Sequence, residues 1–228
     1  MVDFRTRQDR IFDAVNVTLL TLLLFVVAYP VYFVIIASIS SPTHVSLGNV
    51  VLWPRGVNLE AYKYIFSDRR IMLGYRNSLF YASGLTVFSL VLTLPAAYAV
   101  SRKDLKGRNV MMLYMVFTMY FSGGMIPYYV LIRKLGLVDN VLVLMLPGAV
   151  SIFNIIIART FFIQNVPDEV LESAKMDGCT NTRFFIQIVL PLSPAVIAII
   201  VLFNVVGSWN SFFDALLFIN DMKKQPLQ

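Results

Sequence analysis

Residues 17–39 read VTLLTLLLFVVAYPVYFVIIASI, and this stretch contains no charged side chain. It lies inside a longer segment, between Asp13 and Arg55, that carries no Asp, Glu, Lys or Arg. A helix of about 20 apolar residues crosses the roughly 30 Å hydrocarbon core of a membrane. Core helices of soluble proteins average about 11–12 residues and keep a polar face. The stretch therefore predicts a membrane-spanning helix.

Four more uncharged segments of similar length follow along the chain. They are bounded by Arg76 and Arg102, Arg108 and Arg133, Asp139 and Arg159, and Arg183 and Asp214. We predict an all-α fold, a polytopic transmembrane helical bundle with five spans. The expected spans are residues 13–38, 77–101, 109–132, 140–162 and 186–210. Pro and Gly interrupt the last four spans, which is typical of a protein that moves or encloses a pathway.

The composition agrees with a membrane protein and disfavours a soluble enzyme. Of 228 residues, 58% are hydrophobic and 14% are charged, against about 45–50% and about 25% in soluble domains. One His and one Cys assemble no catalytic triad, Cys/His pair or metal-ligand cluster. The phosphate-binding pattern GxxxxGK followed by Ser or Thr does not occur in the sequence. We therefore predict a chain that is not an enzyme and binds no cofactor and no metal.

The first apolar stretch has one alternative reading, a cleaved signal peptide. Arg5, Arg7 and Arg10 precede it, as basic residues precede a signal peptide. The stretch is longer than the 7–15 apolar residues of a signal peptide, and no clear Ala-x-Ala cleavage site follows it. We expect an uncleaved span.

The orientation follows from Lys and Arg, which gather in short cytoplasmic loops. The loop SRKDLKGRN, residues 101–109, contains Arg102, Lys103, Lys106 and Arg108. Five spans place this loop and the N-terminal arm on the same side of the membrane. The totals on the two sides are nearly even, so the density of this loop decides. We predict a multi-pass protein of the cell membrane with a cytoplasmic N-terminus, whose basic residues serve topology and not nucleic-acid binding.

The segment after the first span, residues 38–75, is expected outside. Asn58 suits the N-cap of a short helix over residues 59–66 that lies on the outer membrane surface. The single histidine, His44, precedes it and is expected to be a surface residue.

Residues 164–187 form the most informative loop, on the cytoplasmic side in this orientation. Pro167, Asp168 and Glu169 favour the start of a helix over residues 167–177. Gly178 is suited to a left-handed residue at its end, and Thr180 or Asn181 to the cap of a second helix that runs into the fifth span with a kink at Pro191. These residues alone leave two readings open. The helix either lies on lipid headgroups, with Val170 and Leu171 in lipid, or docks against a soluble partner.

The loop resembles the "EAA" loop of binding-protein-dependent ABC transporter permeases. The pattern E-x-A-x3-G-x9-I-x-L-P is matched by Glu172, Ala174, Gly178, Ile188, Leu190 and Pro191, whereas Ser173 replaces the second Ala. AYAVSRKDLKGRN, FTMYFSGGMIPYYVLIRKLGL, LPGAVSIFNIIIARTFF and LFNVVGSWNSFFDALLFI extend the resemblance to the carbohydrate-uptake branch, including the oligosaccharide importers of Gram-positive bacteria.

The resemblance implies that helix 167–177 docks on a cytoplasmic ATPase and transmits its closure. Gly178 would permit the turn after the helix, Ser173 and Ala174 a close approach, and Glu172 and Asp177 pairing with basic groups of the partner. The implied partners are a second permease subunit in a heterodimer, two ABC ATPase subunits that bind ATP and Mg²⁺ and hydrolyse the ATP, an extracytoplasmic solute-binding protein, the lipid bilayer and a carbohydrate.

Neutral polar residues within the spans are the candidates for a sugar path. They are Asn77, Ser78, Ser83, Thr86, Asn154, Asn204, Ser208, Trp209 and Asn210. Amides and hydroxyls bind sugar hydroxyls, and an aromatic face stacks on a sugar ring. The alternative is that the Asn and Ser residues join helices by hydrogen bonds and that Trp209 lies at the membrane interface.

Two further expectations concern the whole chain. An ion-coupled secondary transporter is the alternative function, although such proteins usually carry ionisable residues within their spans, and the five uncharged segments carry none. Members of the resembled family have a sixth span after the fifth. The chain is therefore expected to lack it, as a fragment or as the product of a truncated gene.

Overall fold

The structure is a computed structural model that describes residues 6–227, so Arg5 of the basic N-terminal arm lies outside the described residues. Over these residues the secondary structure is helical and contains no strand, which confirms the predicted all-α class. The chain divides into two compact units, Met1–Arg69 and Arg70–Gln228.

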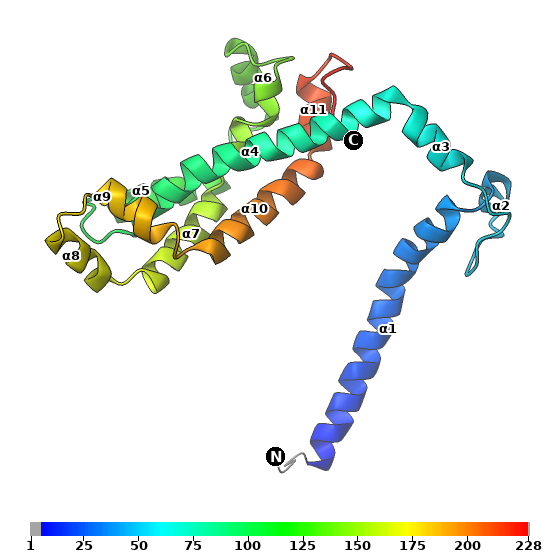
Figure 1. Cartoon of the computed structure of the whole chain (residues 1–228), viewed down its shortest axis with the longest axis horizontal. Coiled ribbons are helices and arrows are strands. Elements are labelled where there is room, and N and C mark those ends of the chain that lie inside the picture. Colours follow the sequence, from blue (N-terminus) through cyan, green and yellow to red (C-terminus); the bar gives the residue numbers. More distant parts are fainter. Residues whose placement is uncertain (1–5, 228) are drawn as a thin grey trace. The chain divides into compact units, whose positions relative to one another are not determined.

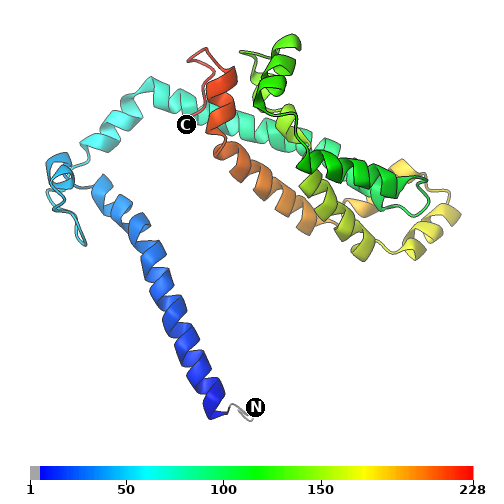
Figure 2. The same cartoon turned by 180° about the vertical axis from the view of Figure 1, so that it is seen from behind.

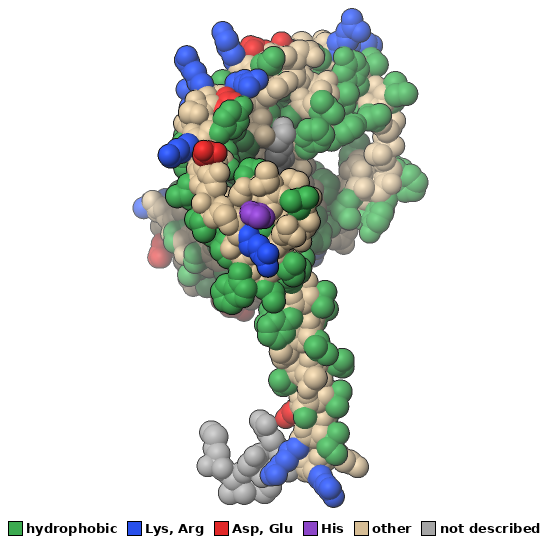
Figure 3. Space-filling model, turned by 90° about the vertical axis from the view of Figure 1, so that its right-hand side faces the viewer, with side chains coloured by type: hydrophobic (Ala, Val, Ile, Leu, Met, Phe, Trp, Pro, Cys, Tyr) green, Lys and Arg blue, Asp and Glu red, His purple; other side chains and the backbone are tan. Residues whose placement is uncertain are grey.

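The first unit contains α1 (Arg7–Ser38), α2 (Pro42–Ser46) and α3 (Glu60–Ser67). A capping box between Thr6 and Asp9 starts α1, and Pro30 lies inside the helix without ending it. Ile36 is its single buried residue. Figure 3 shows hydrophobic side chains along α1 and charged ones at its N-terminal end. Such a helix needs lipid or another protein around it, because its apolar side chains would otherwise be exposed to water.

One expectation for this unit needs correction. The short helix α3 begins at Glu60 and not at residue 59, and Leu59 occupies the cap position. Asn58 still contributes, because its Oδ1 accepts a hydrogen bond from the Glu60 backbone N–H at 2.7 Å. His44 is half-buried, and its side chain is visible at the surface in Figure 3, while its Nδ1 is buried with no hydrogen-bond partner in the described chain.

The second unit contains the remaining elements. They are α4 (Arg69–Ser101, whose first residue belongs to the first unit), α5 (Arg108–Tyr120), α6 (Met125–Lys134), η1 (Val141–Leu144), η2 (Pro147–Ala149), α7 (Ile152–Asn165), α8 (Asp168–Met176), α9 (Asn181–Phe184), η3 (Phe185–Val189), α10 (Pro194–Trp209) and α11 (Phe212–Phe218). Figures 1 and 2 show α7 and α10 beside α4, with α8 and α9 near one end of α4 and α6 and α11 toward the other.

Two helices, α1 and α4, are each long and apolar enough to cross a membrane. Three bent pairs raise the number to five if each pair is one span. The bends measure 109° between α5 and α6, 45° between Val141–Ala149 and α7, and 84° between Asn181–Val189 and α10. The predicted stretches 109–132, 140–162 and 186–210 are therefore broken helices and not continuous ones.

The largest break falls at a pair of glycines. Residues 121–124 leave the helical conformation between α5 and α6, and Gly124 has φ +83°. Side chains with a Cβ rarely adopt this conformation, so Gly124 permits the sharp turn. Pro95, by contrast, lies inside α4 without breaking it.

Two hydrophobic clusters organise the second unit. The larger cluster joins α4, α7, α8, α9, η3 and α10. The smaller cluster joins α6, η1 and α11 with the residue that follows α11, through Ile132, Val143, Phe218 and Ile219. We call residues 98–108 and 162–190 the α8 end, and residues 125–149 and 208–227 the α11 end.

Candidate functional site

The helix that matches the family motif is short and has a well-defined end. It covers Asp168–Met176, with Pro167 as its N-cap, and so is shorter than the predicted 167–177. Gly178 has φ +74°, which confirms the expected left-handed residue. The N–H of Gly178 donates to the Lys175 carbonyl at 3.0 Å and that of Cys179 to the Ala174 carbonyl at 2.9 Å. This pair of bonds is the Schellman motif, and it satisfies two carbonyls at the helix end.

The two faces of α8 differ in burial. Leu171 and Ala174 are 3% and 8% exposed and belong to the larger hydrophobic cluster. Glu172 and Asp177 are exposed, and Met176 is 89% exposed. The reading that placed Leu171 in lipid is therefore wrong, because the chain itself covers Leu171. The exposed face has the polar side chains and the room that a docking surface requires.

Ser173, the departure from the motif, is accommodated within the helix. It is exposed, and its Oγ donates to the Glu169 carbonyl at 3.0 Å. The hydroxyl is thus satisfied one turn back in α8, so the substitution for Ala leaves no unpaired polar atom.

The second half of the motif forms a corner. Ile188 and Leu190 are half-buried against the larger cluster, whereas Pro191 is exposed in the turn before α10. The sequence predicted one helix that enters the fifth span with a kink at Pro191. The structure instead ends η3 at Val189 and starts α10 at Pro194, with an angle of 84° between the two helical parts. Pro191 has no N–H to continue the helix, which favours a break there.

Charged residues from the loop between α4 and α5 contact α8 at both of its ends. Lys103 Nζ lies 2.6 Å from Asp168 Oδ2 in the first turn of α8. Asp104 Oδ2 lies 3.9 Å from Lys175 Nζ in the last turn, and its carboxylate also accepts hydrogen bonds from Arg102 at 3.1 and 3.2 Å. From the sequence, Arg102 and Lys103 indicate topology and not these contacts, although the dense charge in residues 101–109 is a signal that could have pointed to them.

These contacts change the acidity of both carboxyl groups. The hydrogen bonds from Arg102 to Asp104 lower the pKa of that carboxyl, with a further contribution from Lys175. The Lys103 ammonium lowers the pKa of the Asp168 carboxyl in the same way. Both carboxylates are therefore ionised at neutral pH.

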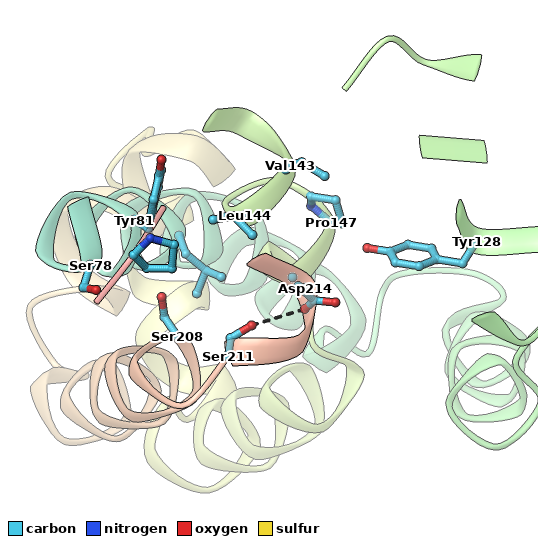
Figure 4. A pocket seen from close by; sticks show the side chains of 12 residues that line it. Ser78, Tyr81, Tyr128, Val143, Leu144, Pro147, Ser208, Ser211 and Asp214 are labelled. Atoms are coloured by element: carbon cyan, nitrogen blue, oxygen red, sulfur yellow. Dashed lines mark hydrogen bonds between the residues drawn. The ribbon is translucent and has the colours of Figure 1, made fainter. Parts of the chain in front are cut away.

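A cavity of about 50 Å³ lies at the α11 end. Ser78 and Tyr81 of α4, Tyr128 of α6, Ser208 of α10 and Asp214 of α11 supply polar groups to its wall, as Figure 4 shows. Ser211 also lines it and donates a hydrogen bond to Asp214 Oδ2 at 3.3 Å. Ligand pockets usually measure about 300–1,000 Å³, so this cavity holds no sugar ring in the present conformation.

The structure gives most of the predicted path residues other surroundings. Ser208 and Ser78 line the cavity. Asn77 is buried, and its Nδ2 donates to the carbonyls of Lys223 and Gln225 at 2.8 and 3.0 Å. Asn210 caps α10 and donates to the Val206 carbonyl at 3.0 Å.

The other path candidates are also located by the structure. Trp209 ends α10 with its ring 6.2 Å from that of Tyr75, and Thr86 donates to the Ala82 carbonyl of its own helix. Asn154 and Asn204 are buried in α7 and α10, and the Asn204 Nδ2 has no hydrogen-bond partner in the described chain. Ser83 is exposed.

Tyr81, Tyr128, Ser211 and Asp214 line the cavity without having been singled out in the sequence. Tyr81 follows Asn77 and Ser78 at helical spacing, so one face of α4 carries all three. Ser211 directly follows the predicted Ser208–Asn210 group, and Asp214 comes three residues later. Helical spacing and sequence proximity were thus the signals that could have found three of the four.

Asp139 holds the C-terminal segment beside this cavity. It has φ +61°, which is uncommon for a residue other than glycine. Its Oδ1 accepts hydrogen bonds from the N–H groups of Asn220 and Asp221 at 3.1 and 3.0 Å, and its own N–H donates to the Phe218 carbonyl at 2.8 Å. The N–H of Asp221, that of Asn220 and the Lys224 ammonium lower the pKa of the Asp139 carboxyl, in that order.

Known proteins resemble this chain in a region that includes both the α8 end and the α11 end. Residues 71–226 match the family described as "Binding-protein-dependent transport system inner membrane component". Protein LplC of Bacillus subtilis (strain 168) is 40% identical over 223 residues, which cover 98% of this chain and 75% of that protein. The polygalacturonan/rhamnogalacturonan transport system permease protein YtcP of the same organism is 41% identical over 221 residues, covering 97% of this chain and 77% of that protein.

A solved structure has the same fold. It is described as a bacterial ABC transporter involved in the import of the acidic polysaccharide alginate. One of its chains superposes with a TM-score of 0.94 at 34% sequence identity, and the match covers 100% of this chain and 81% of that one. The likeness thus includes the broken helices of the second unit as well as its continuous ones.

Proposed function

Because the chain belongs to the binding-protein-dependent transport system inner membrane components, we propose that it is the permease subunit of an ATP-driven importer of an oligosaccharide. In this proposal α8 is the coupling helix that receives the closure of an ATPase. The α8 end faces the cytoplasm, together with the N-terminus of α1, and the α11 end faces outward.

The observation that carries the proposal is the division of α8 into two faces. Leu171 and Ala174 pack into the cluster that also contains side chains of α4, α7 and α10. Glu172, Met176 and Asp177 remain exposed on the same short helix. A force applied to the exposed face therefore reaches the long helices through packed side chains. Packed interiors transmit displacement because they have few voids.

The partners follow from this arrangement and from the family. We propose that two ABC ATPase subunits bind and hydrolyse ATP below the membrane and that the chain itself is not an enzyme. A second permease subunit pairs with this chain, and an extracytoplasmic solute-binding protein delivers the carbohydrate. Two relatives are described as permeases of transport systems for polygalacturonan/rhamnogalacturonan and for arabinooligosaccharides, which supports an oligosaccharide as the substrate class.

The substrate path is proposed to pass the cavity at the α11 end. Ser78, Tyr81, Ser208, Ser211 and Asp214 line it. Hydroxyl and carboxylate groups of this kind can bind sugar hydroxyls, although those of Ser78 and Tyr81 now bind the backbone of Leu227 and Lys224. Because about 50 Å³ admits no sugar ring, the path would have to widen during transport. Rotation at the breaks around Gly124 and Pro191 supplies a physical means.

Copurification of the ATPase with the membrane-inserted chain tests the coupling role. Glu172→Arg reverses a charge on the exposed face, and Gly178→Pro requires φ near −65° where the chain has +74°. Both variants are expected to reduce the recovered ATPase to near background, while insertion into the membrane is unchanged.

Two matched controls sharpen this test. Gly178→Asn tolerates the left-handed conformation and is expected to retain the ATPase. Glu60→Arg makes the same charge reversal on α3, in the first unit, and is also expected to retain it. If Glu172→Arg and Gly178→Pro change neither association nor uptake, α8 is not the coupling helix. Uptake that survives ATP depletion but stops when the ion gradient collapses would instead identify an ion-coupled transporter.

A further inference from the structure

The loop between α4 and α5 contacts α8 through ion pairs, and we call its residues 102–107 the strap. Two adjacent residues of the strap have opposite charges. Lys103 pairs with Asp168 at 2.6 Å, and Asp104 lies 3.9 Å from Lys175. The strap therefore contacts the first and the last turn of α8, which lie about 10 Å apart along the helix axis at 1.5 Å per residue.

The strap itself is attached to α4. Arg102 directly follows α4, and its guanidinium lies 6.0 Å from the centre of the Tyr98 ring while it donates two hydrogen bonds to Asp104. Tyr98 belongs to the larger hydrophobic cluster, and Leu105 packs against that cluster. The strap is thus fixed to the end of α4 on one side and to α8 on the other.

Charged side chains, and not close packing, make the connection to the first turn of α8. A cleft of about 310 Å³ separates the strap from this turn and is lined by Arg102, Lys103, Pro167, Asp168 and Glu169. A second cleft, of about 300 Å³, lies along Arg102, Asp104 and Leu105. The strap is therefore bordered by open space, and ion pairs connect it to α8 across that space.

We propose that the strap sets the orientation of α8 relative to α4, and that Lys103 and Asp104 are positioning residues for the transmission of ATPase closure. This inference rests on the proposed function, which makes α8 the receiver of that closure. A single ion pair would let α8 pivot about it. Two pairs of opposite polarity, one at each end of the helix, can form at the same time only if α8 runs in one direction along the strap and in one register.

The two ion pairs can orient α8, but they add little to the stability of the fold. The four side chains are 43–75% exposed, and exposed ion pairs stabilise a fold weakly. They can therefore break and re-form as α8 moves, without unfolding the surrounding cluster. Loss of one pair is expected to leave α8 folded on Leu171 and Ala174 but free to change its angle.

The test measures both the angle of α8 and the efficiency of transport. Spin labels at Met176→Cys on α8 and Val87→Cys on α4, in a Cys179→Ser background, report the distribution of distances between the two helices in the full chain in lipid nanodiscs. In proteoliposomes of the complete transporter, the ratio of sugar taken up to ATP hydrolysed reports coupling. Both are measured for Lys103→Glu, Asp168→Lys and the double exchange.

We expect each single variant to broaden the distance distribution and to lower the uptake per ATP severalfold while the ATPase still copurifies. The double exchange should narrow the distribution again and restore the ratio, which a general loss of fold would not do. Asp104→Lys with Lys175→Asp provides the same cycle at the other end of α8. Lys106→Glu makes the same charge reversal within the strap and serves as the matched control, because Lys106 has no ion pair in the described chain.

The outcomes separate this inference from the proposed function. An unchanged distance distribution in the single variants overturns the strap as a positioning element, whatever the transport activity. A broadened distribution with unchanged uptake per ATP overturns its part in transmission. If the wild-type chain recovers no ATPase, the proposed function fails and transmission fails with it, and the distance measurement still decides whether the strap orients α8.

Discussion

The α8 end and the α11 end of the second unit are held together by different kinds of bond. At the α8 end, pairs of exposed charged side chains connect the strap to α8. At the α11 end, side chains bind the backbone of the C-terminal segment: Asp139 binds Asn220 and Asp221, Asn77 binds Lys223 and Gln225, and Tyr81 binds Lys224.

This difference determines which end can move at low cost. A bond to a backbone N–H or carbonyl fixes the position of the main chain. Asn77 and Tyr81, which make three of these bonds, are buried, and a buried polar side chain that loses its partner is costly. An exposed ion pair exchanges its partner for water and salt at little cost. The α8 end is therefore built as an adjustable joint, and the α11 end as a clamp on residues 220–225.

The largest loss of stability is expected when a buried phenylalanine is removed from the hydrophobic cluster at either end. Phe184 and Phe218 are both fully buried, Phe184 beside Tyr98 and Phe218 stacked on Tyr129. Truncation of a buried Phe to Ala costs about 3–5 kcal/mol. Phe218→Ala should release the α11 end and Phe184→Ala the α8 end, each leaving the other intact.

Hydrogen exchange of the protein in nanodiscs, resolved over residues 168–190 and 211–227, measures this division. Phe184→Leu and Phe218→Leu are the controls, since Leu keeps much of the volume. Equal loss of protection at both ends from either Ala variant would show that the two clusters unfold as one, and the comparison would fail.

A smaller effect is expected from Asp139, which belongs to the α11 end alone. Asp139→Ala removes the acceptor for the two N–H groups. It also places Ala at φ +61°, a left-handed conformation that Ala adopts less readily than Asp or Asn. Asp139→Asn keeps an acceptor oxygen and tolerates the left-handed conformation. Exchange at Asn220 and Asp221 should rise strongly in the Ala variant and slightly in the Asn variant, with residues 168–176 unchanged.

Asp139→Gly separates the two causes in that prediction. Gly adopts φ +61° without strain but supplies no acceptor. If the Gly variant exchanges as slowly as the wild type, the conformation of residue 139 matters and its carboxylate does not hold the clamp.

Much of the fold was predictable because it depends on local patterns. Uncharged segments indicate helices in a membrane, and the all-α class and the permease family are confirmed. Gly178 and the short helix before it were predictable for the same reason, since a helix end is encoded within a few residues. The five spans stay a prediction, because two single helices and three bent pairs meet the requirements.

What the sequence did not predict depends on residues that are far apart in the chain. Asn77 had the side chain expected of a sugar ligand, but its amide binds the backbone around Lys223. Lys103 fits the excess of basic residues in a cytoplasmic loop, and its ion pair with Asp168 is apparent only from the folded structure. The 84° turn near Pro191 could not be distinguished from a kink, because Pro95 shows that the same residue type is tolerated inside a helix.

The smallest effects are expected from salt and acid, and together they distinguish the two ends. The exposed pairs of the strap contribute about 0–1 kcal/mol each. At 1 M salt the screening length falls to about 3 Å, so exchange in residues 168–176 should increase by at most about fivefold for each pair that is lost, and exchange at Asn220 and Asp221 should stay constant. Acid should affect both ends, because the pKa values of Asp104, Asp168 and Asp139 are all lowered in the fold. A carboxylate with a lowered pKa contributes stability that is complete above its unfolded value, about 3.9, and that is lost as the pH falls through the lower folded value. Protection at both ends should therefore persist from neutral pH to about pH 4 and decline only below it. Exchange measured as a function of pH, at low and at high salt, tests this prediction.

Salt-dependent exchange at Asn220 and Asp221 would mean that the Lys224 charge, and not the two backbone bonds, holds the clamp. The contrast between joint and clamp would then be wrong.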